Sequence, residues 1–255
     1  MNNKEIIDIA MQQSAFDSNC MMEDFKSNVN KVVLSEKSPR ARKYLKLPFL
    51  CDLTSYGNNI VASASNDLIK EVEWYITKYH VEHCFETPNL HRLMERLKPY
   101  NLNVCFMAEY FLPDMEVLKQ LPCQYEIKVM EPEHFAEYYL PEWSNALCEK
   151  RKELDSLAVG AFDNGKLIGL AGASADCDTM WQIGIDVMPD YRRQGIASSL
   201  TSRLALEILG KGIVPFYCCA WSNLKSARNA IKSGFRPAWV QITAREDSYI
   251  AEMNE

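Results

Sequence analysis

The residues with the clearest chemical potential form a short basic segment that contains one glycine, Arg192-Arg193-Gln194-Gly195-Ile196-Ala197. An apolar run precedes this segment and a four-residue apolar repeat follows it, which predicts a strand, a loop and a helix. The first turn of a helix carries unpaired N–H groups and partial positive charge, so it binds anions well. Gly195 lets a phosphate approach the backbone, and the two arginines add charge. The segment therefore predicts a pyrophosphate site.

A second segment has the same order of elements. Residues 214–221 are typical of a buried strand, 222–226 open a short helix, and Gly234-Phe235 closes it. The helix after the basic segment has its apolar stripe at Ile196, Leu200, Leu204 and Ile208.

Together these segments resemble the GNAT superfamily of acyl-CoA-dependent N-acyltransferases, whose signature is Arg/Gln-x-x-Gly-x-Gly/Ala after a strand that ends in Val-x-Pro. Here Val187-Met188-Pro189 precedes residues 192–197, and every defined position matches. The pattern of residues 223–239 is most similar to the branch that includes zwittermicin-resistance-type acetyltransferases.

The resemblance implies that acetyl-CoA is the co-substrate and that no metal takes part. An Asn at position 223 would contact the pantetheine arm. The residues that match the family's cofactor-binding positions are Val187, Arg192, Arg193, Gln194, Gly195, Ile196, Ala197, Ser198, Asn223 and Ser226.

The resemblance also implies catalytic roles. In the family, a β-bulge at the position of Val187 presents a backbone N–H to the acyl carbonyl, and the strands splay so that pantetheine pairs with the sheet. A Tyr four residues before the Gly of Gly-Phe protonates the leaving thiolate, but here that position is Ala230. Either Ser226 replaces this acid, or CoA needs none. Ser226 alternatively stabilises the helix N-terminus from the N3 position.

The general base is less defined, because the acceptor nitrogen must lose its proton to some group. Asp186 is a candidate, although strand alternation places its side chain on the sheet face opposite Ile185 and Val187. The alternatives are Tyr191, Glu109, other carboxylates of the first half of the chain, or a water relay.

The remaining pattern predicts two domains, an N-terminal α/β domain at 1–115 with a candidate acceptor-side role and a GNAT domain at 124–255. The fold class is α/β, a mixed and mostly antiparallel twisted sheet flanked by helices. In the second domain we expect a helix over 131–149, a hairpin of 157–162 with 167–173 around Asn164-Gly165, and strands at 181–187 and 236–244.

Composition narrows the class of protein. The chain has 255 residues, 47% of them hydrophobic, a net charge of −6 and nine cysteines without a Cys-x-x-Cys pair. These values favour a cytoplasmic protein without disulfides, a secretory signal or a membrane span, and they offer no basic surface for nucleic acid. The acidic balance favours amine substrates, and a homodimer is a candidate assembly.

Two other motifs have plainer explanations. Residues 160–166 imitate the spacing of a nucleotide P-loop, but Leu167 stands where Ser or Thr should bind magnesium, and the context is a hairpin. The residues His80, His83, Cys84, Glu86 and His91 fit no zinc spacing. We therefore expect an acetyl-CoA-dependent N-acetyltransferase acting on a small amine, such as an amino-containing antibiotic or metabolite. The alternative is a non-catalytic acyl-CoA-binding or regulatory protein, because the acidic Tyr is missing.

Overall fold

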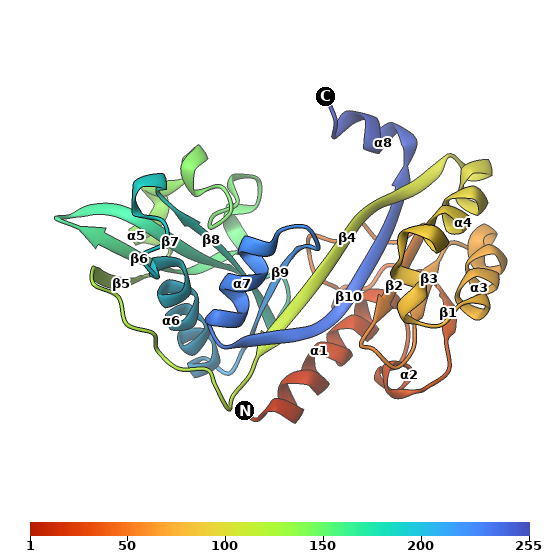
Figure 1. Cartoon of the computed structure of the whole chain (residues 1–255), viewed down its shortest axis with the longest axis horizontal. Coiled ribbons are helices and arrows are strands. Elements are labelled where there is room, and N and C mark those ends of the chain that lie inside the picture. The colour runs from red at the N-terminus through yellow and green to blue at the C-terminus, as the bar shows by residue number, and fades with distance from the viewer. The chain divides into compact units, whose positions relative to one another are not determined.

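A computed structural model describes all residues from 1 to 255. Ten strands form one mixed, mostly antiparallel sheet in the order β1-β3-β2-β10-β4-β9-β8-β7-β6-β5, with helices on its faces (Figure 1). The expected fold class is thereby confirmed. The chain divides into two compact units that are discontinuous in sequence. The first unit comprises Met1–Ile9 and Phe111–Pro237, and the second comprises Ala10–Tyr110 and Ala238–Glu255.

The second unit is built on the edge strand β1 and its neighbours. Its elements are most of α1 (Asn3–Ser18), α2 (Met22–Lys26), β1 (Lys31–Leu34), β2 (Cys51–Ser55), β3 (Val61–Ala64), α3 (Ile69–Lys78), α4 (Thr87–Leu97), most of β4 (Leu102–Pro113) and of β10 (Phe235–Glu246), and α8 (Asp247–Glu252). Short 3-10 turns lie at Asn66–Leu68, Glu82–Phe85 and Lys98–Tyr100. Strand β1 pairs with β3 in parallel, whereas β2 pairs antiparallel with β3 and β10.

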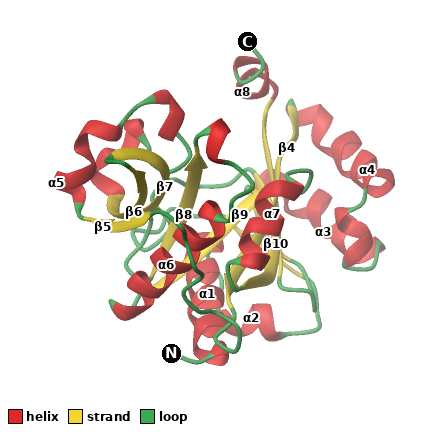
Figure 2. Ribbon diagram, turned by 60° about the vertical axis from the view of Figure 1, so that its left-hand side comes forward, coloured by secondary structure: helices red, strands yellow, loops and turns green.

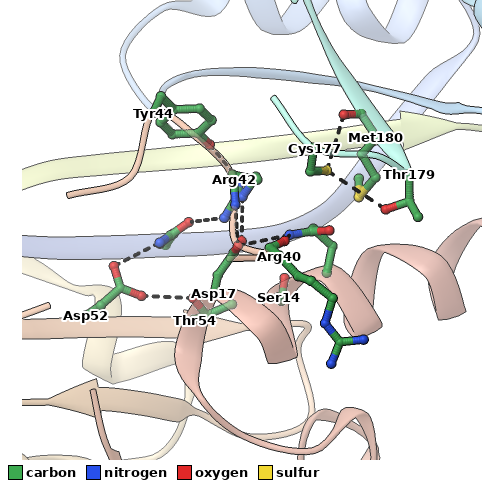
Figure 3. Close-up of polar contacts among 12 residues, drawn as sticks. Ser14, Asp17, Arg40, Arg42, Tyr44, Asp52, Thr54, Cys177, Thr179 and Met180 are labelled. Atoms are coloured by element: carbon green, nitrogen blue, oxygen red, sulfur yellow. Dashed lines mark hydrogen bonds and ion pairs between the residues drawn. The ribbon is translucent and has the colours of Figure 1, made fainter. Parts of the chain in front are cut away.

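A buried polar network crosses the sheet of the second unit (Figure 3). Arg42 donates through Nε to Asp17 Oδ2 at 2.5 Å, and Gln241 Nε2 donates to Asp52 Oδ1 at 2.8 Å. Thr243 Oγ1 also donates to Asp52 Oδ1, at 2.6 Å. These residues join helix α1, strand β2 and strand β10, so hydrogen bonds replace the water that their side chains lose on burial.

The first unit carries the expected helix after the basic segment. Its elements are β5 (Glu126–Met130), α5 (Pro132–Phe135), β6 (Asp155–Asp163), β7 (Lys166–Ser174), β8 (Met180–Val187), α6 (Ile196–Gly210), β9 (Val214–Ala220) and α7 (Leu224–Lys232). Helix α6 lies across β6, β7 and β8 (Figure 2). Its apolar stripe, Ile196, Leu200, Leu204 and Ile208, is at most 2% exposed, which confirms the periodicity.

The expected hairpin is also present. Strands β6 and β7 pair antiparallel up to Asp163 and Lys166, and the two residues between them, Asn164 and Gly165, have φ of 49° and 83°. Positive φ at both positions is the requirement of a type I′ turn, which Asn-Gly satisfies at little cost.

The prediction of a single helix over residues 131–149 is wrong. Only Pro132–Phe135 is α-helical, and short 3-10 turns follow at Ala136–Tyr138, Pro141–Trp143 and Glu149–Leu154. Pro141 lacks an N–H and so cannot continue a helix. The N–H groups of Asn145 and Ala146 instead donate to the carboxylate of Asp186 at 2.8 and 3.0 Å. A non-local acceptor therefore holds this segment in its turn conformation.

Candidate active site

The site begins where two neighbouring parallel strands part. Strands β8 and β9 pair from Met180 and Val214 as far as Ile183 and Tyr217, and beyond these residues they no longer pair. Strand β8 nevertheless continues to Val187 and β9 to Ala220. The last residues of both strands therefore keep backbone donors and acceptors that no strand partner satisfies on that side.

The N–H of Val187 points toward the parted side. Strands β7 and β8 keep one register from Ser174 to Gly169, with no bulge at Val187, and Met188 N donates to Ile168 O at 2.9 Å. Directly opposite residues in an antiparallel ladder alternate between hydrogen-bonded and non-hydrogen-bonded pairs. Because Met188 is bonded to β7, Val187 belongs to a non-bonded pair, and its N–H is directed away from β7 without the bulge that the resemblance implies.

The basic loop folds back onto the same strand end. Arg192 Nε donates to the carbonyl oxygen of Val187 at 3.0 Å, so this guanidinium fixes the loop to β8. Arg193 has φ of 65°, which is rare for a residue other than glycine, and Gly195 has φ of 84°. A Cβ on Gly195 would meet no atom within 4 Å, so conformation and not space requires glycine here.

Helix α6 starts at this loop with free amide groups. The first bond of the helix runs from Ser199 N to Gly195 O at 3.0 Å, so the N–H groups of Ile196, Ala197 and Ser198 have no acceptor within the helix. Ser198 Oγ turns back to Gly195 O at 3.0 Å. The amides of residues 196–198, together with the helix dipole, provide the positive end that an anionic phosphate needs.

The side chain of Gln194 anchors the loop to a neighbouring segment of the chain. Its side-chain oxygen accepts hydrogen bonds from Gln124 Nε2 and from the Tyr125 hydroxyl, both at 2.7 Å. Tyr191, which lies beside Tyr125, donates its hydroxyl to Asp163 Oδ2 at 3.0 Å. The side chain of Gln194 therefore anchors the loop, and sequence spacing gives no sign of Gln124 or Tyr125.

Asn223 and Ser226 meet at the start of α7. Asn223 is the N-cap, and its side-chain oxygen accepts from Ser226 N at 3.2 Å, so Ser226 occupies the N3 position. The hydroxyl of Ser226 lies 2.7 Å from the hydroxyl of Tyr217 on β9. Ala230, which takes the position of the family's acidic Tyr, is fully buried in the core of this unit.

Tyr217 is itself a buried phenol that the motif does not reveal. It is 3% exposed, and burial raises its pKa, while hydrogen bonds with Ser226 and Asn229 oppose that rise. The residue therefore stays protonated at neutral pH. Its only sequence signal is a Tyr inside an apolar strand.

Asp186 lies on the opposite face of β8, as strand alternation predicts. Its carboxylate accepts from Asn145 N, Asn145 Nδ2 and Ala146 N at 2.8, 2.6 and 3.0 Å. Ile185 and Val187 pack instead against the core that α6 covers. Asp186 therefore holds the 145–146 turn against the sheet.

The structure thus brings Val187 and residues 192–198 together at one end of β8, and it joins Asn223 and Ser226 on α7. It contains no group of three or more His, Cys, Asp or Glu side chains that could bind a metal ion. None of its helices combines the length and the apolarity needed to cross a membrane.

Comparison with known proteins identifies a family match. The family described as GNAT acetyltransferase matches residues 54–238, more than half of the chain. The match reaches into the N-terminal part, which the motifs alone do not connect with the family. No curated protein matches the chain.

Among solved structures, a GCN5-related N-acetyltransferase-like protein from Streptococcus suis is 20% identical, with a TM-score of 0.44 over 62% of this chain and 69% of that chain. An acetyltransferase of the GNAT family from Colwellia psychrerythraea is 15% identical, with a TM-score of 0.42 over 56% and 57%. An aminoglycoside N-acetyltransferase in complex with CoA is 20% identical, with a TM-score of 0.36 over 46% and 93%.

Proposed function

Because the chain belongs to the GNAT acetyltransferase family, we propose that it transfers the acetyl group of acetyl-CoA to the nitrogen of a small-molecule amine. The acceptors that we propose are amino-containing antibiotics or metabolites, in keeping with the resemblance to the zwittermicin-resistance-type branch and with the net charge of −6. The alternative, an acyl-CoA-binding protein without catalysis, differs from this proposal in turnover alone.

The proposal rests on the arrangement of backbone groups at the end of β8. There the parallel pairing with β9 has stopped, the N–H of Val187 is directed to the unpaired side, and the free amides of α6 begin a few residues later. An extended pantetheine chain can hydrogen-bond to the unpaired backbone, while the pyrophosphate binds the amides of residues 196–198 with Arg192 and Arg193.

Two of the three chemical steps then have a residue, and the third is assigned to water. The neutral acceptor nitrogen attacks the thioester carbon, and the N–H of Val187 stabilises the negative charge that develops on the carbonyl oxygen. As the carbon–sulfur bond breaks, its electron pair goes to sulfur, and we assign Ser226 as the hydrogen-bond donor to it. Asp186 is already committed to the 145–146 turn, so we assign deprotonation of the acceptor to water.

The cofactor site can be tested with one substitution and a matched control. Gly195→Glu places bulk and negative charge where the pyrophosphate would bind, and we expect isothermal titration calorimetry to detect no acetyl-CoA binding. Gly212→Glu is the control, because Gly212 lies beyond the other end of α6, has φ of 79° and also has no atom within 4 Å of an added Cβ. Equal affinity in the two variants would remove the cofactor site from this loop.

Turnover separates the proposal from its alternative. We expect the protein to release CoA thiol, measured with a thiol reagent, in the presence of at least one member of a panel of amino sugars, aminopolyols and polyamines. Acetyl-CoA binding without thiol release across this panel would instead support a binding protein. Unchanged release in Gly195→Glu would show that the activity belongs to another site.

A further inference from the structure

Two hydroxyl groups from different elements meet beside the parted strands. Tyr217 is the last residue of β9 that pairs with β8, and its hydroxyl lies 2.7 Å from that of Ser226 in the first turn of α7. The ring of Tyr217 packs between Phe111 and Phe235, and its side chain is almost wholly buried, whereas Ser226 is partly exposed. The buried phenol therefore contacts a residue that is partly exposed to solvent.

The hydrogen bond between the two hydroxyls can run in either direction. The amide nitrogen of Asn229 donates to Thr201 Oγ1 at 3.1 Å, and Asn229 also forms a hydrogen bond with the phenol oxygen. Ser226 Oγ is in place to accept the hydroxyl hydrogen of Tyr217. When Tyr217 donates, the hydrogen of Ser226 is free for an acceptor outside the chain.

We propose that Tyr217 is a positioning residue for the transfer, which orients the hydroxyl of Ser226 toward the sulfur of bound CoA. This inference rests on the proposed function. In the transfer, the nitrogen–carbon bond forms, the carbon–sulfur bond breaks, and sulfur receives the electron pair. Ser226 donates a hydrogen bond to the resulting thiolate, and the proton that the acceptor nitrogen loses reaches the sulfur through water. No proton leaves Tyr217 permanently.

The second anchor of Ser226 supports this role. Its backbone N–H donates to the Asn223 side chain, so the residue is fixed through its main chain and through its hydroxyl. A serine that only caps the helix would need the first contact alone. A buried tyrosine that only fills the core would need no hydroxyl, because burying an additional polar group is costly.

The test measures the thiol pKa of CoA bound to the intact protein, from the ultraviolet absorbance of the thiolate, and so requires no acceptor. A hydrogen bond to the thiolate lowers this pKa. We expect Ser226→Ala and Tyr217→Phe each to raise it by roughly half to one unit, and the double variant to raise it no further. Ser226→Thr, which keeps the hydroxyl, should retain the pKa of the unmodified protein.

A hydroxyl at the other end of α7 provides the control. Ser233→Ala removes another buried hydroxyl of the α7 region, one bonded to Asn229 O at 2.7 Å, and should leave the thiol pKa unchanged. A shift in Ser226→Ala but not in Tyr217→Phe would overturn the role of Tyr217. If neither variant changed the thiol pKa of bound CoA, the proposed contacts from Tyr217 to Ser226 and from Ser226 to the sulfur would be overturned. The transferase proposal would remain. Failure of the unmodified protein to bind CoA would overturn both.

Discussion

At the scale of single residues, Asp186 lies beside Val187, the proposed oxyanion donor, but its hydrogen bonds stabilise the fold. Its three hydrogen-bond donors all come from Asn145 and Ala146. A carboxylate that accepts this many bonds is held in one orientation, on the face of β8 opposite Val187. From the sequence, Asp186 is a candidate base because it lies beside Val187. Nothing in the sequence indicates that a turn 41 residues earlier donates hydrogen bonds to its carboxylate.

This view of Asp186 predicts a separation of stability from catalysis. We expect Asp186→Ala to lower the free energy of unfolding by about 1–3 kcal/mol, because the turn loses its acceptors. The pH profile of kcat/KM should keep its shape, since we assign deprotonation of the acceptor to water. Urea unfolding and acetyl-transfer rates check the two parts. A lost acidic limb of the pH profile in a fully folded variant would make Asp186 the base.

At the scale of elements, a pair of glycines explains how the 145–146 turn packs against the sheet. Gly172 on β7 and Gly184 on β8 are directly opposite each other in the register. A Cβ on Gly172 would lie 1.9 Å from Ala146 O, and one on Gly184 would lie 1.8 Å from Asn145 O. The backbone of the turn therefore occupies the space that side chains would fill.

Substitution of either glycine should displace the turn. We expect Gly184→Ala to destabilise the protein by about 2–3 kcal/mol or more, because backbone atoms cannot move aside as a flexible side chain does. Gly210→Ala is the control, since an added Cβ in this last residue of α6 meets no atom within 4 Å. Thermal unfolding of both variants measures the difference. A Gly184→Ala variant as stable as the control would show that the turn does not need this contact.

These elements also show what the sequence could predict. The stripe of α6 and the Asn164-Gly165 hairpin depend on local periodicity and local φ preferences, and both are correctly predicted. The loop at 192–197 is recognisable because its chemistry resides in consecutive residues. The broken segment 131–149 depends on Asp186 and on the two glycines, and the contact of Tyr217 with Ser226 depends on how α7 docks on β9. No local pattern contains such information.

At the scale of the whole molecule, each unit contains a buried carboxyl group whose pKa is raised above its ordinary value. In the second unit, burial raises the pKa of Asp52 to about 6, although Thr243, Gln241 and Thr54 donate hydrogen bonds that oppose this change. In the first unit, burial likewise raises the pKa of Asp155 to about 6, against hydrogen bonds from Cys148 N and the Tyr139 hydroxyl. Both groups are therefore more easily protonated in the folded protein than in the unfolded chain.

The sign of the pH dependence follows from this difference. The unfolded carboxyls have an ordinary pKa of 3.8, so between that value and about 6 the folded state binds more protons than the unfolded state. The free energy of unfolding must then fall as pH rises through this window. The stabilisation is complete below pH 3.8 and is lost above about pH 6. For the fully buried Asp52, every tenfold difference in proton affinity between the folded and unfolded states corresponds to about 1.4 kcal/mol.

Asparagine variants can assign this dependence to the two carboxyls. Asp52→Asn keeps an oxygen that can accept from Gln241 and Thr243 but removes the titrating proton, so we expect the loss of stability between about pH 4 and pH 7 to be smaller than in the unmodified protein. Asp155→Asn should have a similar effect through the other unit. Urea unfolding at both pH values provides the measurement. If Asp52→Asn showed the same pH dependence as the unmodified protein, Asp52 would be ionised throughout this range, and its three hydrogen bonds would outweigh the cost of its burial.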